Sequence, residues 1–141
     1  MDHNSNAKKV LFLCTGNSAR SQMAEGLLKN YDKGRFEVAS AGVAPAGVNP
    51  NAISVMKEIG IDISDQTSDQ ISRGMLDQAE QLITLCGDAR ESCPVVPARV
   101  EKRHWDLEDP ARAEGTEEQV LAKFREIRDQ IKKHVEELVK E

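Results

Sequence analysis

The chain has 141 residues, of which 39% are hydrophobic and 30% are charged, a composition typical of a single soluble globular domain. Its formal net charge is −5 and it has no long basic run, which argues against a nucleic-acid-binding protein. The N-terminal residues lack the apolar core of a signal peptide, and the first apolar run is too short to cross a membrane, so we expect a cytosolic protein with no membrane segment. We expect a monomer with one domain over residues 1–141, in which residues 1–7 form a flexible tail.

Apolar runs and helical periodicity alternate along the chain. The first half is expected to contain, in order, a strand that ends at Cys14, a helix at 21–33, a strand at 35–42 and a helix at 49–60. The second half is expected to contain a short helix at 71–79, a strand at 81–86, a shorter strand at 102–105 and a long C-terminal helix. In this last helix apolar residues recur at spacings of three and four, and Thr116 with Gln119 predicts a capping box at its start.

Strands separated by helices predict right-handed crossovers and a mostly parallel sheet. We therefore expect an α/β fold, a single-domain three-layer sandwich whose four-stranded sheet is flanked by helices. Ligands of such sheets bind at the carboxyl ends of the strands. Cys14 and Cys86 each end a predicted strand, so both thiols are expected at this edge. In a cytosolic chain, three cysteines favour reactive or metal-bound thiols over structural disulfides.

A thiol, several small residues and a guanidinium group lie between the first strand and the first helix. A strand-to-helix loop directs backbone N–H groups inward, and the helix adds the positive end of its dipole. Gly16 permits a positive φ angle, and Arg20 offers a two-pronged donor to a tetrahedral oxyanion. The same groups stabilise a thiolate, which makes Cys14 the candidate nucleophile. The candidate oxyanion-binding residues are Thr15, Gly16, Asn17, Ser18, Ala19, Arg20 and Ser21.

The segment VLFLCTGNSARSQMAEGLL at residues 10–28 resembles the phosphate loop of the low-molecular-weight tyrosine phosphatase fold. Within that fold the chain is most similar to the thioredoxin-coupled arsenate reductases, through TSDQ, LITLCGDARESCP and HWDLEDPA as well. The resemblance extends from about Lys8 to the final helix. It implies an enzyme of arsenic detoxification that reduces arsenate to arsenite, and because aromatic residues are scarce in the chain we expect no more than weak phosphatase activity.

Cys86 and Cys93 bracket a polar segment that begins with Gly87. Seven residues of unbroken helix rise about 10.5 Å, whereas the Cα atoms of a disulfide lie about 4.4–6.8 Å apart, so a bond between these cysteines requires the segment to loop or unwind. The resemblance implies a relay in which Cys14 attacks arsenate, Cys86 attacks Cys14, and Cys93 attacks Cys86. Thioredoxin then reduces the Cys86–Cys93 disulfide, with glutaredoxin and glutathione as the alternative reductant. A zinc site formed by Cys86, Cys93 and His104 suits neither the usual ligand spacing nor the usual number of ligands.

Asp106, Glu108 and Asp109 are three candidates for a general acid. Pro110 follows Asp109 directly and makes it the most rigidly held of the three. The resemblance implies the same choice, since the aspartate before proline is the acid in this superfamily. The alternative is a turn aspartate in an acidic surface loop.

The resemblance also implies a potassium ion near the loop. The ligand pattern of the reductases falls on Asn17, Glu25, Ser40 and Asp69, all of which supply the oxygen atoms that such a cation prefers. A hydrogen-bond network that fixes the loop without an ion is the alternative. Ser21 is expected to donate a hydrogen bond to the thiolate of Cys14, and no other cofactor is expected.

Two other functions use part of this pattern. A tyrosine phosphatase would use Cys14, Arg20 and Asp109 without a relay, but phosphatases of this fold line the cleft with aromatic residues, and this chain has Ala111 after Asp109-Pro110. A thiol redox sensor or anion-binding module would explain the cysteines but neither Arg20 nor Asp109.

Overall fold

The computed structural model describes residues 7–31, 34–85 and 96–141. All four strands of its sheet are parallel, in the order β2-β1-β3-β4. The described elements are β1 (Lys8–Cys14), α1 (Arg20–Tyr31), β2 (Phe36–Gly42), α2 (Pro50–Glu58), α3 (Arg73–Gln78), β3 (Gln81–Thr84), β4 (Glu101–His104), the short 3-10 helix η2 (Pro110–Arg112) and α5 (Glu117–Val139). The predicted α/β fold with a four-stranded parallel sheet is confirmed.

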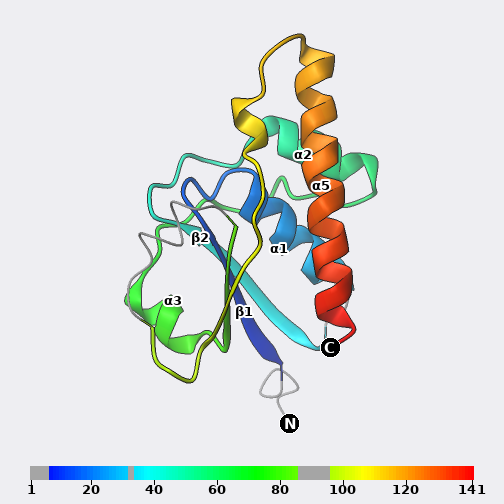
Figure 1. Ribbon diagram of the computed structural model, residues 1–141. Coiled ribbons are helices and arrows are strands. Elements are labelled where there is room, and N and C mark those ends of the chain that lie inside the picture. Colours follow the sequence, from blue (N-terminus) through cyan, green and yellow to red (C-terminus); the bar gives the residue numbers. More distant parts are fainter. Residues whose placement is uncertain (1–6, 32–33, 86–95) are drawn as a thin grey trace.

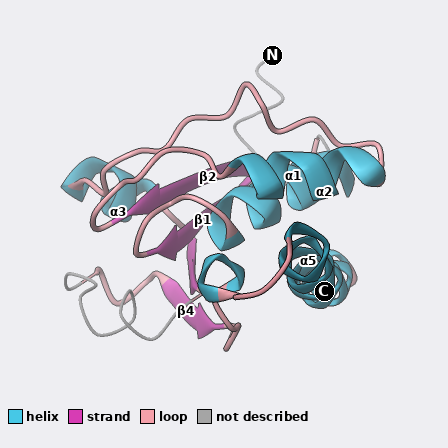
Figure 2. Cartoon of the chain, turned by 90° about the horizontal axis from the view of Figure 1, so that it is seen from above, coloured by secondary structure: helices cyan, strands magenta, loops and turns pink. Residues whose placement is uncertain are grey.

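Helices cover both faces of the sheet (Figure 1). The long helix α5 packs against α1 and α2 on one face. The short helix α3 lies on the opposite side of the sheet, as the view from above also shows (Figure 2). Because both faces are covered, the central strands are buried: β3 along its whole length, and β1 from Val10 to Cys14. These layers form the predicted three-layer sandwich.

The C-terminal helix α5 supplies one wall of the core. Its buried apolar residues recur at spacings of three and four, as the sequence predicts, and are Phe124, Ile127, Ile131, Val135 and Leu138. The predicted capping box is present, because the Thr116 hydroxyl accepts from the Gln119 N–H while the Gln119 side chain accepts from the Thr116 N–H. Within the described part of the chain, no helix is long and apolar enough to span a membrane.

Several boundaries differ by one or two residues from the sequence predictions. The strand predicted at 81–86 ends at Thr84, although the Leu85 N–H still donates to the carbonyl of β1 at Leu13 (3.0 Å). The first helix begins one residue earlier, at Arg20. Ala7, the last residue of the predicted tail, is buried, and the Lys8 N–H that follows it donates to the Arg35 carbonyl (2.8 Å). Residues 1–6 lie outside the described residues.

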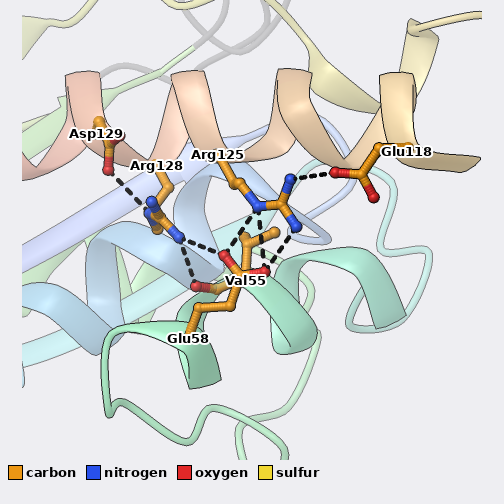
Figure 3. A network of polar contacts seen from close by, with 6 residues as sticks. All are labelled: Val55, Glu58, Glu118, Arg125, Arg128 and Asp129. Carbon is orange, nitrogen blue, oxygen red and sulfur yellow. Dashed lines mark hydrogen bonds and ion pairs between the residues drawn. The ribbon is translucent and has the colours of Figure 1, made fainter.

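Two arginines of α5 hold the C-terminal end of α2 (Figure 3). Arg125 donates to the carboxylate of Glu58 at 2.9–3.1 Å, and Arg128 donates to Glu58 and to the carbonyl oxygen of Val55, both at 2.9 Å. Carbonyl groups in the last turn of a helix lack partners within that helix, so the Arg128 side chain acts as a cap from a neighbouring element. Hydrogen bonds from Arg125, and to a smaller extent from Arg128, hold the pKa of Glu58 below its usual value. Charged groups thus fix α5 on α2, which apolar periodicity does not predict.

The carboxyl ends of the strands meet at one edge of the sheet. Cys14 is in register with Gly42 of β2, and Leu13 is in register with Thr84 of β3. Cys14 therefore lies at the edge where parallel sheets bind ligands, as predicted. Cys86, the second thiol predicted for this edge, lies outside the described residues.

Candidate active site

The loop between β1 and α1 turns its carbonyl groups outward. The carbonyl oxygens of four consecutive residues accept hydrogen bonds at 2.8–3.0 Å: Thr15 from the Ala44 N–H, Gly16 from the Ala46 N–H, Asn17 from the Gln22 side chain and Ser18 from the Asn49 N–H. In a planar trans peptide, the C=O of one residue and the N–H of the next point in opposite directions. The N–H groups of residues 16–19 therefore point toward the inside of the loop, where they form a cradle for an anion.

Asn17 supplies the positive φ angle of the loop. Its φ is 44°, whereas the sequence pointed to Gly16 for this conformation. Asparagine tolerates the left-handed region better than most residues, and here its fully buried side chain fixes it in place. The amide group donates to Ser21 (2.8 Å) and Ser40 (2.9 Å), and its oxygen accepts from the Asp69 N–H (2.7 Å). One side chain thus joins the loop to α1, to β2 and to the 64–70 segment.

The thiol of Cys14 lies at the floor of this cradle. It is 2% exposed, and its sulfur is 2.9 Å from the hydroxyl oxygen of Ser21, a contact in which either atom could be the donor. Because the Asn17 amide already donates to this hydroxyl oxygen, the Ser21 proton is available to the sulfur. A donor in this position stabilises a thiolate. The contact between Cys14 and Ser21 is the one that the sequence led us to expect.

A second set of polar side chains braces the loop from outside, and the sequence reasoning missed it. Gln22 donates to the carbonyls of Asn17 and Thr67, both at 2.9 Å, and is fully buried. Gln66 donates in turn to the Gln22 side chain (2.8 Å), and Ser68 donates to the Gly16 carbonyl (3.1 Å). Apart from the contact between Gln22 and Asn17, these contacts join residues more than forty positions apart, so no local spacing could reveal them. The only available signal was the polar stretch at 64–70.

Gly42 allows β2 to approach the loop closely. A Cβ atom at this position would lie 2.7 Å from the Thr15 carbonyl oxygen and 2.8 Å from the Asn17 nitrogen, both backbone atoms of the loop. We expect Gly42→Ala to distort the cradle and to weaken phosphate binding at least about tenfold, since backbone atoms cannot move aside as a flexible side chain can. Isothermal titration calorimetry with inorganic phosphate measures this loss. Gly74→Ala is the matched control, because its nearest heavy atom would lie 3.9 Å away, and unchanged phosphate binding by Gly42→Ala would contradict the expectation.

Arg20 and Asp109 meet at the mouth of the loop. Arg20 is the first residue of α1 and donates from Nη1 to the Leu107 carbonyl (3.0 Å). Asp109 caps η2, so its Oδ1 accepts from the Ala111 N–H (3.0 Å). Its Oδ2 lies 3.6 Å from Nη2 of Arg20 and 3.8 Å from Nε of Arg112, beyond hydrogen-bond distance of either. One oxygen of Asp109 is anchored and the other faces the site.

The three sequence candidates for the general acid differ in their position relative to the cavity. Glu108 lines the cavity but is exposed and paired with Lys123 (2.8 Å). Asp106 is exposed and does not line the cavity, whereas Asp109 both lines it and faces Arg20. The geometry favours Asp109, the residue that the proline pointed to.

The site opens into a cavity of about 740 Å³ between the loop, the 44–46 segment and η2. Cys14, Thr15, Gly16, Ser18, Ala19 and Arg20 line its floor, and Ala44, Ala46, Glu108, Asp109, Ala111, Arg112 and Ala113 line its mouth. The side chains of Asn17 and Ser21, two residues also predicted to bind the oxyanion, do not line the cavity but hydrogen-bond to each other, while the backbone N–H of Asn17 belongs to the cradle. No aromatic side chain is among the described residues around this cavity. Little is therefore available to stack on a phenyl ring.

The four residues of the predicted potassium site lie in one hydrogen-bonded network. Asn17 presents its amide NH₂ group to Ser40, and the Ser40 hydroxyl donates to Oε1 of Glu25 (2.5 Å). Oε2 of Glu25 is paired with the ammonium group of Lys29, and the Asp69 N–H donates to Asn17. These contacts are those of the network alternative, and a potassium ion at this place stays a prediction, since Glu25 is paired with Lys29 in the structure. Within the described residues, no cluster of three or more His, Cys, Asp or Glu side chains could hold a metal ion.

The cysteines of the predicted relay are only partly described. Cys14 carries a free thiol. Cys86 and Cys93 lie outside the described residues, and so does any zinc site that includes them. His104, the third residue of that alternative, has its Nδ1 2.7 Å from the hydroxyl of Thr84.

Comparison with known proteins assigns a family to this geometry. Residues 9–141 match the model of the family described as low molecular weight phosphotyrosine protein phosphatase. The chain is 54% identical over 130 residues to an arsenate reductase from Halalkalibacterium halodurans, with 92% of this chain and 94% of the relative covered. Among solved structures, it is similar to an arsenate reductase in the phosphate binding state (TM-score 0.77, 41% identity, 94% and 96% of the two chains covered). It is also similar to a thioredoxin-dependent arsenate reductase from Corynebacterium glutamicum (TM-score 0.78, 31% identity, 96% of this chain and 62% of the other covered).

Proposed function

The chain belongs to the low molecular weight phosphotyrosine protein phosphatase family, as one of its arsenate reductases, and we propose that it reduces arsenate through Cys14, Cys86 and Cys93 in turn. The observation that carries the proposal is the position of the Cys14 thiol. It lies at the floor of an anion cradle, beside a hydroxyl donor and opposite Asp109. Arsenic detoxification in the cytoplasm is the corresponding biological role.

The first step joins sulfur to arsenic. The Cys14 thiolate attacks As(V) while the N–H groups of residues 16–19 and the guanidinium of Arg20 hold the other oxygens. The oxygen opposite the sulfur leaves as water, with its proton supplied by the unanchored Oδ2 of Asp109. The product is a Cys14–arsenic adduct in which arsenic is still As(V). A phosphatase of this fold takes the equivalent step with phosphorus.

The next steps carry the redox change. The Cys86 thiolate attacks the sulfur of Cys14, the S–As bond breaks, and its electron pair stays on arsenic, which leaves as As(III) arsenite. Cys93 then attacks the sulfur of Cys86, which releases the Cys14 thiolate and forms a Cys86–Cys93 disulfide. A dithiol of thioredoxin reduces this disulfide by exchange and so supplies both electrons. Phosphate cannot follow this route, because phosphorus does not accept the electron pair.

Two observations support reduction over aryl phosphate hydrolysis. The mouth of the cavity is lined by alanines, and no aromatic side chain lies among the described residues around it. Relatives that are 54% and 41% identical to this chain, each over more than nine tenths of it, are arsenate reductases. Hydrolysis of aryl phosphates is therefore expected only as a weak side activity.

The relay needs no potassium ion. Potassium at Asn17, Glu25, Ser40 and Asp69 stays a prediction from the resemblance, and binding there would require Glu25 to exchange the ammonium of Lys29 for the ion. Thioredoxin stays the proposed reductant, since an internal Cys86–Cys93 pair presents it with a protein disulfide. A monomer suffices for every step.

A coupled assay tests the relay. With thioredoxin, thioredoxin reductase and NADPH present, the wild-type chain is expected to consume NADPH only when arsenate is added. Cys93→Ser is expected to release a single arsenite per chain and to trap the Cys14–Cys86 disulfide, because nothing remains to attack Cys86. Full multiple turnover by Cys93→Ser would rule out the relay. Rapid hydrolysis of p-nitrophenyl phosphate without any response to arsenate would instead favour the phosphatase function.

A further inference from the structure

Two arginines line the cavity, and only one of them is exposed. The Arg20 side chain is 11% exposed at the floor, whereas the Arg112 side chain is 83% exposed at the mouth. Two carboxylates line the same mouth, and the chain carries a net charge of −5. An oxyanion that approaches the buried cradle must therefore pass two carboxylates, which repel it. Among the described residues that line the cavity, Arg112 is the exposed cation that can attract it.

We propose that Arg112 is an oxyanion-binding residue that draws doubly charged tetrahedral oxyanions into the cradle and offsets the charge of Asp109 once they are bound. The inference rests on the proposed function, because it concerns the same oxyanion site.

The position of Asp109 explains why a second arginine is needed. Its Oδ2 faces both guanidinium groups, at 3.6 Å from Arg20 and 3.8 Å from Arg112. When an oxyanion enters, the charge of Arg20 is shared with it, and the Asp109 carboxylate faces a second negative group until it takes up the proton that it passes to the leaving oxygen. Arg112 belongs to η2, the same short helix that Asp109 caps, so its guanidinium stays close to the Asp109 carboxylate. Its positive charge offsets the repulsion between this carboxylate and the bound oxyanion.

The neighbouring carboxylate needs no such partner. Glu108 is already paired with the ammonium of Lys123 at 2.8 Å. The contribution of Arg112 is thus directed at Asp109 and at the incoming anion. Because Arg112 is exposed, water and salt weaken its interaction, and we expect a modest effect on affinity that falls as ionic strength rises.

Inorganic phosphate is the probe, since its binding requires the cradle but no cysteine relay. At pH 8 and low sodium chloride, we expect Arg112→Gln to weaken phosphate binding about three- to tenfold in isothermal titration calorimetry. Arg112→Lys, which keeps the charge, is expected to stay within about twofold of wild type. In the coupled assay, Arg112→Gln is expected to raise the KM for arsenate by a similar factor with little change in kcat. At about 0.5 M sodium chloride the difference from wild type should nearly vanish.

Arg73→Gln is the matched control. Arg73 is also an exposed arginine at 3.7 Å from an aspartate, Asp77, but it lies on α3 and does not line the cavity. Both variants change the net charge equally, so equal phosphate affinities would overturn the proposal, as would a loss of affinity that is insensitive to salt. If Arg112→Gln weakens phosphate binding while the wild-type chain fails to reduce arsenate, the relay is wrong and the role of Arg112 stands. If wild type does not bind phosphate at all, both proposals fail.

Discussion

Cys14→Ser is expected to abolish arsenate-dependent NADPH consumption while phosphate binding is kept within a few fold. The serine hydroxyl has nearly the shape of the thiol, so the cradle formed by residues 16–19 is retained. It is not ionised near neutral pH, however, and cannot supply the sulfur that the second step attacks. The coupled thioredoxin assay measures the loss, and calorimetry with inorganic phosphate shows whether the oxyanion site is intact.

The two measurements on Cys14→Ser separate chemistry from folding. Lost turnover with retained phosphate binding supports Cys14 as the nucleophile. Turnover above a few per cent of wild type would mean that another thiol attacks arsenate. Loss of both properties would be ascribed to the fold, and circular dichroism would then decide whether the sheet and helices persist.

Local patterns explain why most of the fold could be predicted. The apolar run before Cys14 forms a central strand covered on both faces, and the spacing from Phe124 to Leu138 forms the buried face of α5. Thr116 and Gln119 lie three residues apart, so their capping box is visible in the sequence. The contacts of Arg128 with α2 were not predictable, because they depend on how two helices pack seventy residues apart.

The same contrast holds at the site. Cys14, Arg20 and Ser21 are close in the sequence, so one strand-to-helix loop was enough to place the thiol, the guanidinium and the hydroxyl together. The support of the loop comes from Gln22 and Gln66, which meet only in the folded chain. Sequence patterns therefore predicted which candidate reacting groups lie together better than they predicted the residues that hold these groups in position.

A shared first step explains how one fold serves both hydrolysis and reduction. The cradle, Arg20 and Asp109 can place a thiolate on phosphorus or arsenic alike. Two features bias this chain toward arsenic: the small side chains at the mouth, such as Ala44 and Ala111, and the additional cysteines at 86 and 93. The first leaves no aromatic surface for a phenyl ring among the described residues, and the second supplies the two thiols that the proposed relay requires.

Asp109→Asn is expected to lower kcat for arsenate about 10²- to 10³-fold, with the KM unchanged or lower. Asparagine caps helices as well as aspartate does, so its side-chain oxygen can still accept from the Ala111 N–H and keep η2 in place. Its amide cannot transfer a proton to the leaving oxygen, which is the step that Oδ2 of Asp109 is proposed to perform. Removing the carboxylate also removes a negative charge 3.6 Å from Arg20, which favours anion binding.

Glu108→Gln is the matched control for this prediction, because it removes a carboxylate from the same cavity and leaves the proposed acid in place. Steady-state kinetics with arsenate should show a kcat within about twofold of wild type for this variant, since Glu108 is directed at Lys123. Equal losses in both variants would point to cavity charge as the cause, and a kcat near wild type for Asp109→Asn would assign the proton to another donor. A large fall in kcat for Asp109→Asn alone, without a rise in KM, is the result that a general acid requires, because such an acid acts on the leaving oxygen and not on the bound ground state.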